Sequence, residues 1–279
     1  MGLFDALFRR PRRVTDDSST MELSQEMGGM LFRVANIQGV GQRERQEDSF
    51  AVLNAANPGQ RERQGLFAVV CDGMGGMEDG KLASQCAVET FLELFQNRNP
   101  DLPMPKWMEA CAHTISDYVF QRFSGASGTT LVAVHIQDQM LHWVSVGDSA
   151  IFLLRDGGVF QLNQEHTFLN ELYARELEQE VICKARAEQD EDARRLTSFV
   201  GINHLENVDQ SLQPLPLRKG DGLLLCSDGI SGVLTPAELL EVMSLEPEEG
   251  CALLETMILE KQVPAQDNYT GILISCEER

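Results

Sequence analysis

The chain has 279 residues, of which 43% are hydrophobic and 24% charged, a composition typical of a soluble globular protein. The chain has 23 Lys and Arg residues and 43 Asp and Glu residues, which give a net charge of −20. This charge repels phosphate backbones and therefore disfavours nucleic acid as a partner. No apolar stretch approaches the ~20 residues of a transmembrane helix. The seven cysteines are scattered singly without a CxxC pair, which favours a reducing, cytoplasmic compartment over disulfides or a zinc site.

The N-terminal segment differs from the rest of the chain because residues 1–13 are basic. Its apolar residues would share one face of a short helix that could make weak peripheral contact with an anionic membrane or a partner, but we favour a disordered tail. Residues 11–30 are rich in Asp, Ser, Thr, Gly and Met without periodicity, which predicts a linker. We therefore predict a tail and linker over 1–30 and a folded domain over 31–279.

The first half of this domain is predicted to contain strands, then two helices, then more strands. The strands expected from short apolar runs between turn residues are 31–38, 49–54, 66–71, 129–136, 140–146, 150–155 and 158–162. Apolar residues at helical spacing predict helices over 80–98 and 106–123. The short links between the later strands require antiparallel neighbours.

The second half begins with a highly charged segment, residues 164–195, which we call the flap. It is predicted to be a helical, solvent-facing insertion, and whether it selects substrates or is only a solvated surface stays open at this point. Strands are expected near 207–212, at 222–227 and at 269–276, and helices from Thr235-Pro236 and over 248–261. This order predicts antiparallel sheets covered by helical pairs, an α+β fold.

Two Asp-Gly turns, Asp72-Gly73 and Asp228-Gly229, follow runs that are apolar enough to be fully buried strands. Such strands present a carboxylate at a fixed point. Two further acidic sites, Glu47-Asp48 and Asp267, directly precede strands. Carboxylates that converge without interleaved Lys or Arg repel one another unless cations neutralise them. Because no His or Cys accompanies them, the set favours Mg²⁺ or Mn²⁺ over zinc.

An ordered series of short motifs runs through nearly the whole predicted domain. The motifs are Gly41–Ser49, Asp72–Gly76, Ser127–Leu131, Val146–Ser149, Glu165–Thr167, Leu196–Gly201, Ser227–Gly229 and Asp267–Thr270. Together they resemble the protein phosphatase 2C family of metal-dependent protein serine/threonine phosphatases. Met74 replaces the histidine of many eukaryotic members, as in many bacterial ones, so the resemblance is to the bacterial type.

The resemblance implies a four-layer α/β/β/α sandwich of two antiparallel sheets flanked by pairs of antiparallel helices, with two Mn²⁺ or Mg²⁺ ions at one end. It implies that Asp72 bridges both ions, that the Gly73 carbonyl binds one, and that Asp228 and Asp267 bind the other. By the same resemblance, Glu47 and Asp48 hold metal-bound waters, and Arg43 binds the phosphate through its guanidinium fork. No acidic residue occurs between Tyr118 and Ser127, so a third ion is not expected.

The implied activity is hydrolysis of phosphoserine and phosphothreonine in proteins by a metal-activated water, without a phospho-enzyme intermediate. The implied partners are phosphoprotein substrates and a cognate serine/threonine kinase, and the protein is expected to be a monomer. Two alternatives remain open: a non-catalytic phosphatase-like scaffold, and a hydrolase of small phosphorylated metabolites. The five residues Arg43, Asp48, Asp72, Asp228 and Asp267 argue against the scaffold, because a binding module would not need them all.

Overall fold

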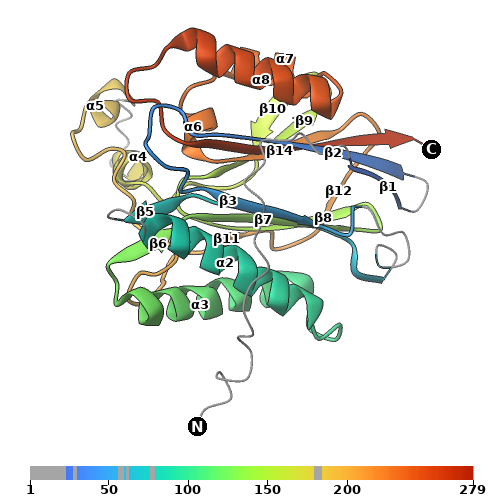
Figure 1. Ribbon diagram of the computed structural model, residues 1–279, viewed down its shortest axis with the longest axis horizontal. Coiled ribbons are helices and arrows are strands. Elements are labelled where there is room, and N and C mark those ends of the chain that lie inside the picture. The colour runs from blue at the N-terminus through green and yellow to red at the C-terminus, as the bar shows by residue number, and fades with distance from the viewer. Residues whose placement is uncertain are drawn as a thin grey trace.

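The computed structural model describes residues 23–27, 30–55, 60, 63–75, 79–178 and 184–278. The membrane or partner contact predicted for residues 1–13 lies outside these residues. Two antiparallel sheets pack face to face, and helices cover both outer faces, which confirms the predicted four-layer α+β sandwich (Figure 1). Among the described residues, no helix is both long and apolar enough to cross a bilayer.

The first sheet contains the N-terminal and C-terminal strands. Its order is β1 (Leu23–Met27), β2 (Met30–Gly39), β14 (Tyr269–Glu278), β13 (Gly222–Cys226), β9 (Ala150–Arg155) and β10 (Gly158–Gln161). β14 pairs with β2 along its whole length, from Tyr269 opposite Gly39 to Glu278 opposite Met30. Strand β1 falls in the segment predicted to be a linker, so the prediction is wrong for these residues. Their polar sequence does not indicate a strand, and it is backbone pairing with β2 that makes them one.

The second sheet is formed by the middle of the chain. Its order is β11 (Asp209–Gln210), β8 (Met140–Val146), β7 (Leu131–Gln137), β4 (Leu66–Cys71) and β3 (Ser49–Leu53), with β12 (Leu215–Pro216) also paired to β8. The strand expected near 207–212 is reduced to the two residues of β11. A small ribbon of β5 (Gly73–Gly75) and β6 (Ser127–Thr129) lies beside this sheet.

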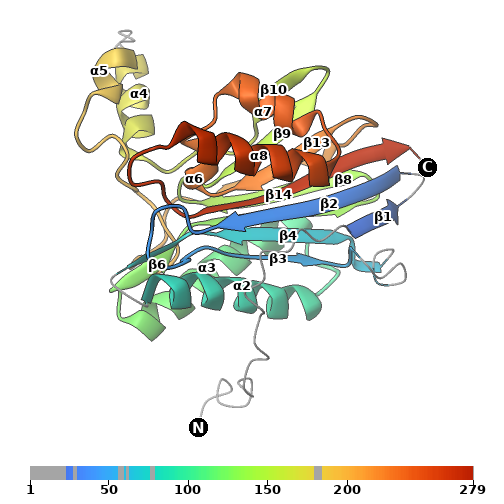
Figure 2. The same ribbon diagram turned by 45° about the horizontal axis from the view of Figure 1, so that its top comes forward.

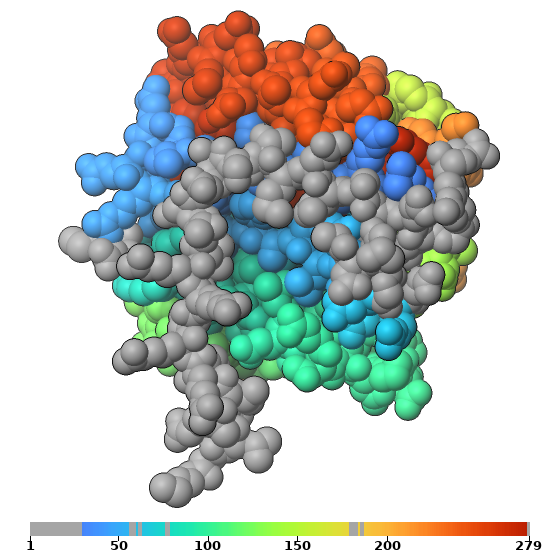
Figure 3. All heavy atoms as spheres, turned by 45° about the vertical axis from the view of Figure 1, so that its right-hand side comes forward, coloured from blue at the N-terminus to red at the C-terminus, as the bar shows by residue number. Residues whose placement is uncertain are grey.

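Successive side chains of a buried strand point to opposite faces of its sheet, so they belong to different hydrophobic cores. Leu66, Ala68 and Val70 of β4 pack between the sheets, whereas Phe67 and Val69 face α2 (Asp79–Gln96) and α3 (Met104–Phe123). The outer face of the first sheet packs on α7 (Pro236–Met243) and α8 (Pro247–Lys261). Figure 3 shows these layers on one face of the molecule, with the orange-red helices, the blue strands and the green helices in succession.

The flap stands at one end of the sandwich (Figure 2). It contains α4 (Phe168–Glu178) and the short α5 (Lys184–Glu188), so the segment predicted to be helical is helical over these two stretches, whereas residues 164–167 and 189–195 are turns and irregular structure. Its base is tied to the fold by the bridge between Thr167 and Leu196. The flap therefore begins and ends at neighbouring points of the sandwich.

Candidate metal centre

Three predicted carboxylates meet where the strands of both sheets end. Asp72 follows β4 directly, Asp228 is the first residue of the short helix α6 (Asp228–Ser231) just after β13, and Asp48 precedes β3. The charges of Asp48 and Asp228 raise the pKa of Asp72, so the three carboxyl groups lie within electrostatic range of one another. The two turns that stand about 155 residues apart in the sequence are thus adjacent in the fold.

The side chain of Asp48 is fully buried and is held by residues of the opposite sheet. The hydroxyl of Ser227 donates to Asp48 Oδ2 at 2.8 Å and accepts from the backbone N–H of Thr270 at 3.0 Å. The Thr270 side chain also hydrogen-bonds to the Asp48 carboxylate. Asp48 precedes a strand of the second sheet, whereas Ser227 directly follows one strand of the first sheet and Thr270 lies in another. The position of the Asp48 carboxylate therefore depends on how the two sheets pack.

Burial sets the electrostatics of this cluster. Desolvation raises the pKa of Asp72 well above its usual value, and the neighbouring charges of Asp48 and Asp228 raise it further. Desolvation likewise raises the pKa of Asp48 to about 6 and raises that of Asp228. Three such carboxylates are unfavourable neighbours at neutral pH unless protons or cations neutralise them.

Two buried carboxylate oxygens indicate that a cation fits here. Within the described part of the chain, neither Asp48 Oδ1 nor Asp228 Oδ1 has a hydrogen-bond partner. Buried polar atoms normally have one, and an unpaired buried carboxylate oxygen is costly. A hard divalent cation would satisfy both oxygens and neutralise the cluster.

The donor set is open rather than closed. Among the described residues, no group of three or more Asp, Glu, His or Cys side chains is placed to hold one metal ion together. Mg²⁺ and Mn²⁺ tolerate this because they usually keep several waters and bind through one or two carboxylates. A structural zinc site, by contrast, needs four protein ligands.

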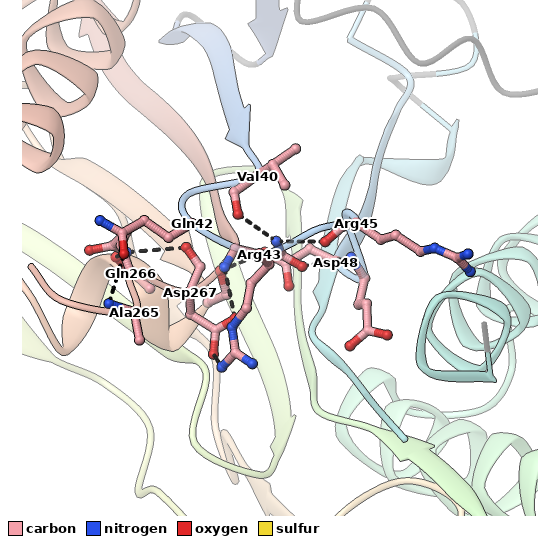
Figure 4. Close-up of polar contacts among 12 residues, drawn as sticks. Val40, Gln42, Arg43, Arg45, Asp48, Ala265, Gln266 and Asp267 are labelled. Carbon is pink, nitrogen blue, oxygen red and sulfur yellow. Dashed lines mark hydrogen bonds and ion pairs between the residues drawn. The ribbon is translucent and has the colours of Figure 1, made fainter. Parts of the chain in front are cut away.

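Arg43 and Asp267 lie side by side (Figure 4), and the charges of both act on the carboxyl group of Asp228. Arg43 Nη2 lies 2.6 Å from Asp267 Oδ2, and the side chains of Arg43 and Asp267 are 54% and 39% exposed. Burial raises the pKa of Glu47, and the charge of Arg43 opposes that rise. The structure thus pairs the residue predicted to bind phosphate with a predicted metal ligand.

One residue that the sequence did not single out holds the loop that carries Arg43 and Glu47. Asn268 is buried and accepts from the backbone N–H of Glu47 at 2.7 Å. Its amide group donates to the carbonyls of Val40 at 2.8 Å and Arg45 at 3.0 Å. A single side chain beside Asp267 therefore sets the course of the loop over 40–47.

Replacing Asn268 by Ala is expected to lower the free energy of unfolding by about 2–4 kcal/mol, because it leaves several buried backbone groups unpaired. It should also lower any hydrolytic activity, since the loop loses its anchor. Guanidinium denaturation and a phosphatase assay check both effects. Asn97→Ala, which removes one hydrogen bond at an exposed helix end, is the matched control and should change stability by less than about 0.5 kcal/mol.

The glycines of the two acidic turns are required by close packing. A Cβ on Gly73 would overlap the carbonyl oxygen of Gly80, and a Cβ on Gly229 would overlap that of Asn268. Neither glycine has a positive φ, so space and not backbone conformation demands glycine here. The orientation of the Gly73 carbonyl toward a metal stays a prediction.

Asp148, in the turn after β8, is a further acidic residue near the cluster. Desolvation and the charges of Asp228 and Glu165 raise its pKa to about 7. Its carboxyl group therefore lies within electrostatic range of the cluster. The signal in the sequence was the Val146–Ser149 motif itself, which places an acid at the end of β8.

The fold of two sheets thus gathers carboxylates at one end, which is the arrangement of a protein that binds divalent cations. Comparison with known proteins narrows the class, since the family model described as protein phosphatase 2C matches residues 42–261. The chain belongs to the protein phosphatase 2C family.

Bacterial proteins are among its relatives. A Mycoplasma pneumoniae protein is 26% identical over 262 residues, which are 89% of this chain and 96% of that protein. The Listeria innocua serine/threonine phosphatase stp is 27% identical over 183 residues, 63% of this chain and 70% of the relative. A solved structure of the phosphatase PstP in complex with two manganese ions covers 89% of this chain and 100% of its own, with a TM-score of 0.70 and 23% identity.

Proposed function

We propose that this chain hydrolyses phosphoserine and phosphothreonine in proteins with the help of two Mn²⁺ or Mg²⁺ ions. The observation that carries the proposal is the cluster of Asp48, Asp72 and Asp228, with two buried carboxylate oxygens that lack partners among the described residues. Family membership and the manganese-containing PstP structure support the same chemistry.

The residues divide into those that hold the ions and those that hold the substrate. Asp72 would bridge both ions, with the Gly73 carbonyl on one and Asp228 and Asp267 on the other. Glu47 and Asp48 would accept hydrogen bonds from waters of the metal centre, and the fixed position of Asp48 suits that task. When bound, the ions would supply the charge that lowers the pKa of water and neutralises phosphoryl oxygens.

Arg43 would bind two phosphoryl oxygens through its planar fork. Its present partner is Asp267, and an ion pair this exposed contributes about 0–1 kcal/mol. Exchanging Asp267 for the phosphoryl group therefore costs little. No side chain of the cluster needs to form a covalent bond with phosphorus, so we propose direct attack by water.

Manganese-dependent hydrolysis of p-nitrophenyl phosphate and of a phosphothreonine peptide tests this function. We expect both substrates to be hydrolysed with Mn²⁺ or Mg²⁺ and neither in EDTA. Inactivity toward both under manganese would favour a non-catalytic scaffold. Activity that is much higher on small phosphorylated metabolites than on the peptide would favour a metabolite hydrolase.

We propose that the protein acts as a monomer on phosphoproteins made by a cognate kinase in the cytoplasm. Support for a reducing compartment comes from the six described cysteines, all buried and none in a disulfide. Residues 1–13 could add weak peripheral contact with a membrane.

A further inference from the structure

A cavity of about 360 Å³ lies between the flap helix α4 and the residues that lead into β11. It adjoins the carboxylate cluster through the turn after β8. His166, in its wall, accepts a hydrogen bond from the backbone N–H of Gly147 at 3.0 Å. Glu165, also in the wall, lies within electrostatic range of Asp148 and Asp228. A ligand at the metal centre could therefore extend into this cavity.

The cavity is negatively charged. Its described lining contains no Lys or Arg, and it contains the four acidic residues Glu165, Glu171, Glu206 and Asp209. His166 does not offset this charge, because burial lowers its pKa and its Nδ1 acts as an acceptor. Among the ion pairs of the described residues, one joins a lining carboxylate to a cation. In this pair Arg175 lies 3.4 Å from Glu171, and both side chains are exposed.

A buried hydroxyl in the wall lacks a partner. Thr167 is 7% exposed, it lines the cavity, and its Oγ1 has no hydrogen-bond partner in the part of the chain that the structure describes. Buried hydroxyls of folded proteins are normally paired. This oxygen is enclosed by the protein, so the groups that a ligand in the cavity would meet are the carboxylates.

We propose that this cavity binds an Arg or Lys side chain of the phosphoprotein substrate, located a few residues from the phosphorylated position. The inference rests on the proposed function and specifies its substrate class. A guanidinium or ammonium group supplies only donors and a positive charge, and the four carboxylates of the described lining have no Lys or Arg among them to supply either. An extended peptide advances about 3.3–3.6 Å per residue, so neighbours of the phosphoresidue can reach a cavity beside the metal centre.

Phosphothreonine peptides that carry one Arg at successive positions on either side of the phosphoresidue test the inference. Each is compared with a peptide that carries norleucine at the same position, which keeps an apolar stem and removes the charge. At one or two positions we expect kcat/KM to be about tenfold higher with Arg, the size of one charge-assisted hydrogen bond. The Glu171→Gln/Glu206→Gln double variant should reduce this preference to about twofold or less.

Three controls separate the cavity from general effects. The exposed Glu260→Gln removes one carboxylate on α8 and should keep the full preference. Thr167→Val should keep the preference, because the hydroxyl that it removes is enclosed by the protein and carries no charge. Hydrolysis of p-nitrophenyl phosphate should stay unchanged in all variants, since this substrate does not reach the cavity.

Equal kcat/KM for Arg and norleucine at every position would overturn the proposal while leaving the phosphatase activity intact. A preference that persists in the double variant would also overturn it, because recognition would then lie elsewhere. Absence of p-nitrophenyl phosphate hydrolysis by the unmodified protein would instead contradict the proposed function.

Discussion

Replacing Asp72 by Asn is expected to lower kcat of manganese-dependent hydrolysis by about 10³-fold or more. Asn keeps the shape of the side chain but removes the charge that would hold both ions together, and the charge that the ions supply is worth several kcal/mol in the transition state. Assays of p-nitrophenyl phosphate over a range of Mn²⁺ concentrations measure the effect. Near-normal activity of this variant would show that Asp72 has no part in the metal centre.

The same variant should be at least as stable as the unmodified protein in EDTA. Since the pKa values of Asp48, Asp72 and Asp228 are raised in the folded state, the folded protein binds more protons than the unfolded chain above about pH 4. The protonated cluster therefore stabilises the folded state at low pH, and this stabilisation is lost as pH rises through about 6 and above. In Asp72→Asn one of the three carboxyl groups no longer becomes charged, so the variant should lose less stability as pH rises.

Melting temperatures in EDTA from pH 5 to pH 8 check this sign. We expect the difference between Asp72→Asn and the unmodified protein to grow with pH in favour of the variant. Asp138→Asn, in the exposed turn between β7 and β8, is the matched control and should show no such trend. A variant that is destabilised equally at all pH values would contradict the electrostatic account.

Replacing Phe67 by Ala is expected to lower the free energy of unfolding by about 3–5 kcal/mol. Phe67 is fully buried on β4, with its ring stacked on Phe95 at 4.6 Å and edge-on to Phe91 at 4.9 Å between ring centroids. The truncation leaves a cavity between the second sheet and α2. Guanidinium denaturation in EDTA measures the loss without the added effect of metal binding.

The exposed Phe160 on β10 provides the control for Phe67. Its side chain is 55% exposed, so Phe160→Ala should change the free energy of unfolding by less than about 1 kcal/mol. Similar losses in the two variants would show that packing between the sheet and α2 is not a main source of stability.

The sequence predicted the parts of the fold whose pattern is local. β4 and β13 are uninterrupted apolar runs, and their burial on both faces follows directly from that composition. Thr235 and Pro236 marked the start of α7, and the structure shows the capping box there. β1 could not be predicted, because its strand character depends on pairing with β2 and not on its own residues.

The acidic residues of the candidate site stood out in the sequence because each lies at a strand end. The residues that hold them did not, since Ser227 and Asp48 are 179 positions apart and Asn268 and Glu47 are 221 apart. Such contacts leave no periodicity or spacing to detect. The contact between Arg43 and Asp267 was hidden for the same reason.

The Asn268 anchor has a consequence for biosynthesis. The loop that carries Arg43 and Glu47 is made 221 residues before Asn268, the side chain that fixes it. A nascent chain still attached to the ribosome before residue 268 has emerged lacks this anchor. The protein should thus gain the ability to remove phosphate only after residue 268 has been made and has left the ribosome.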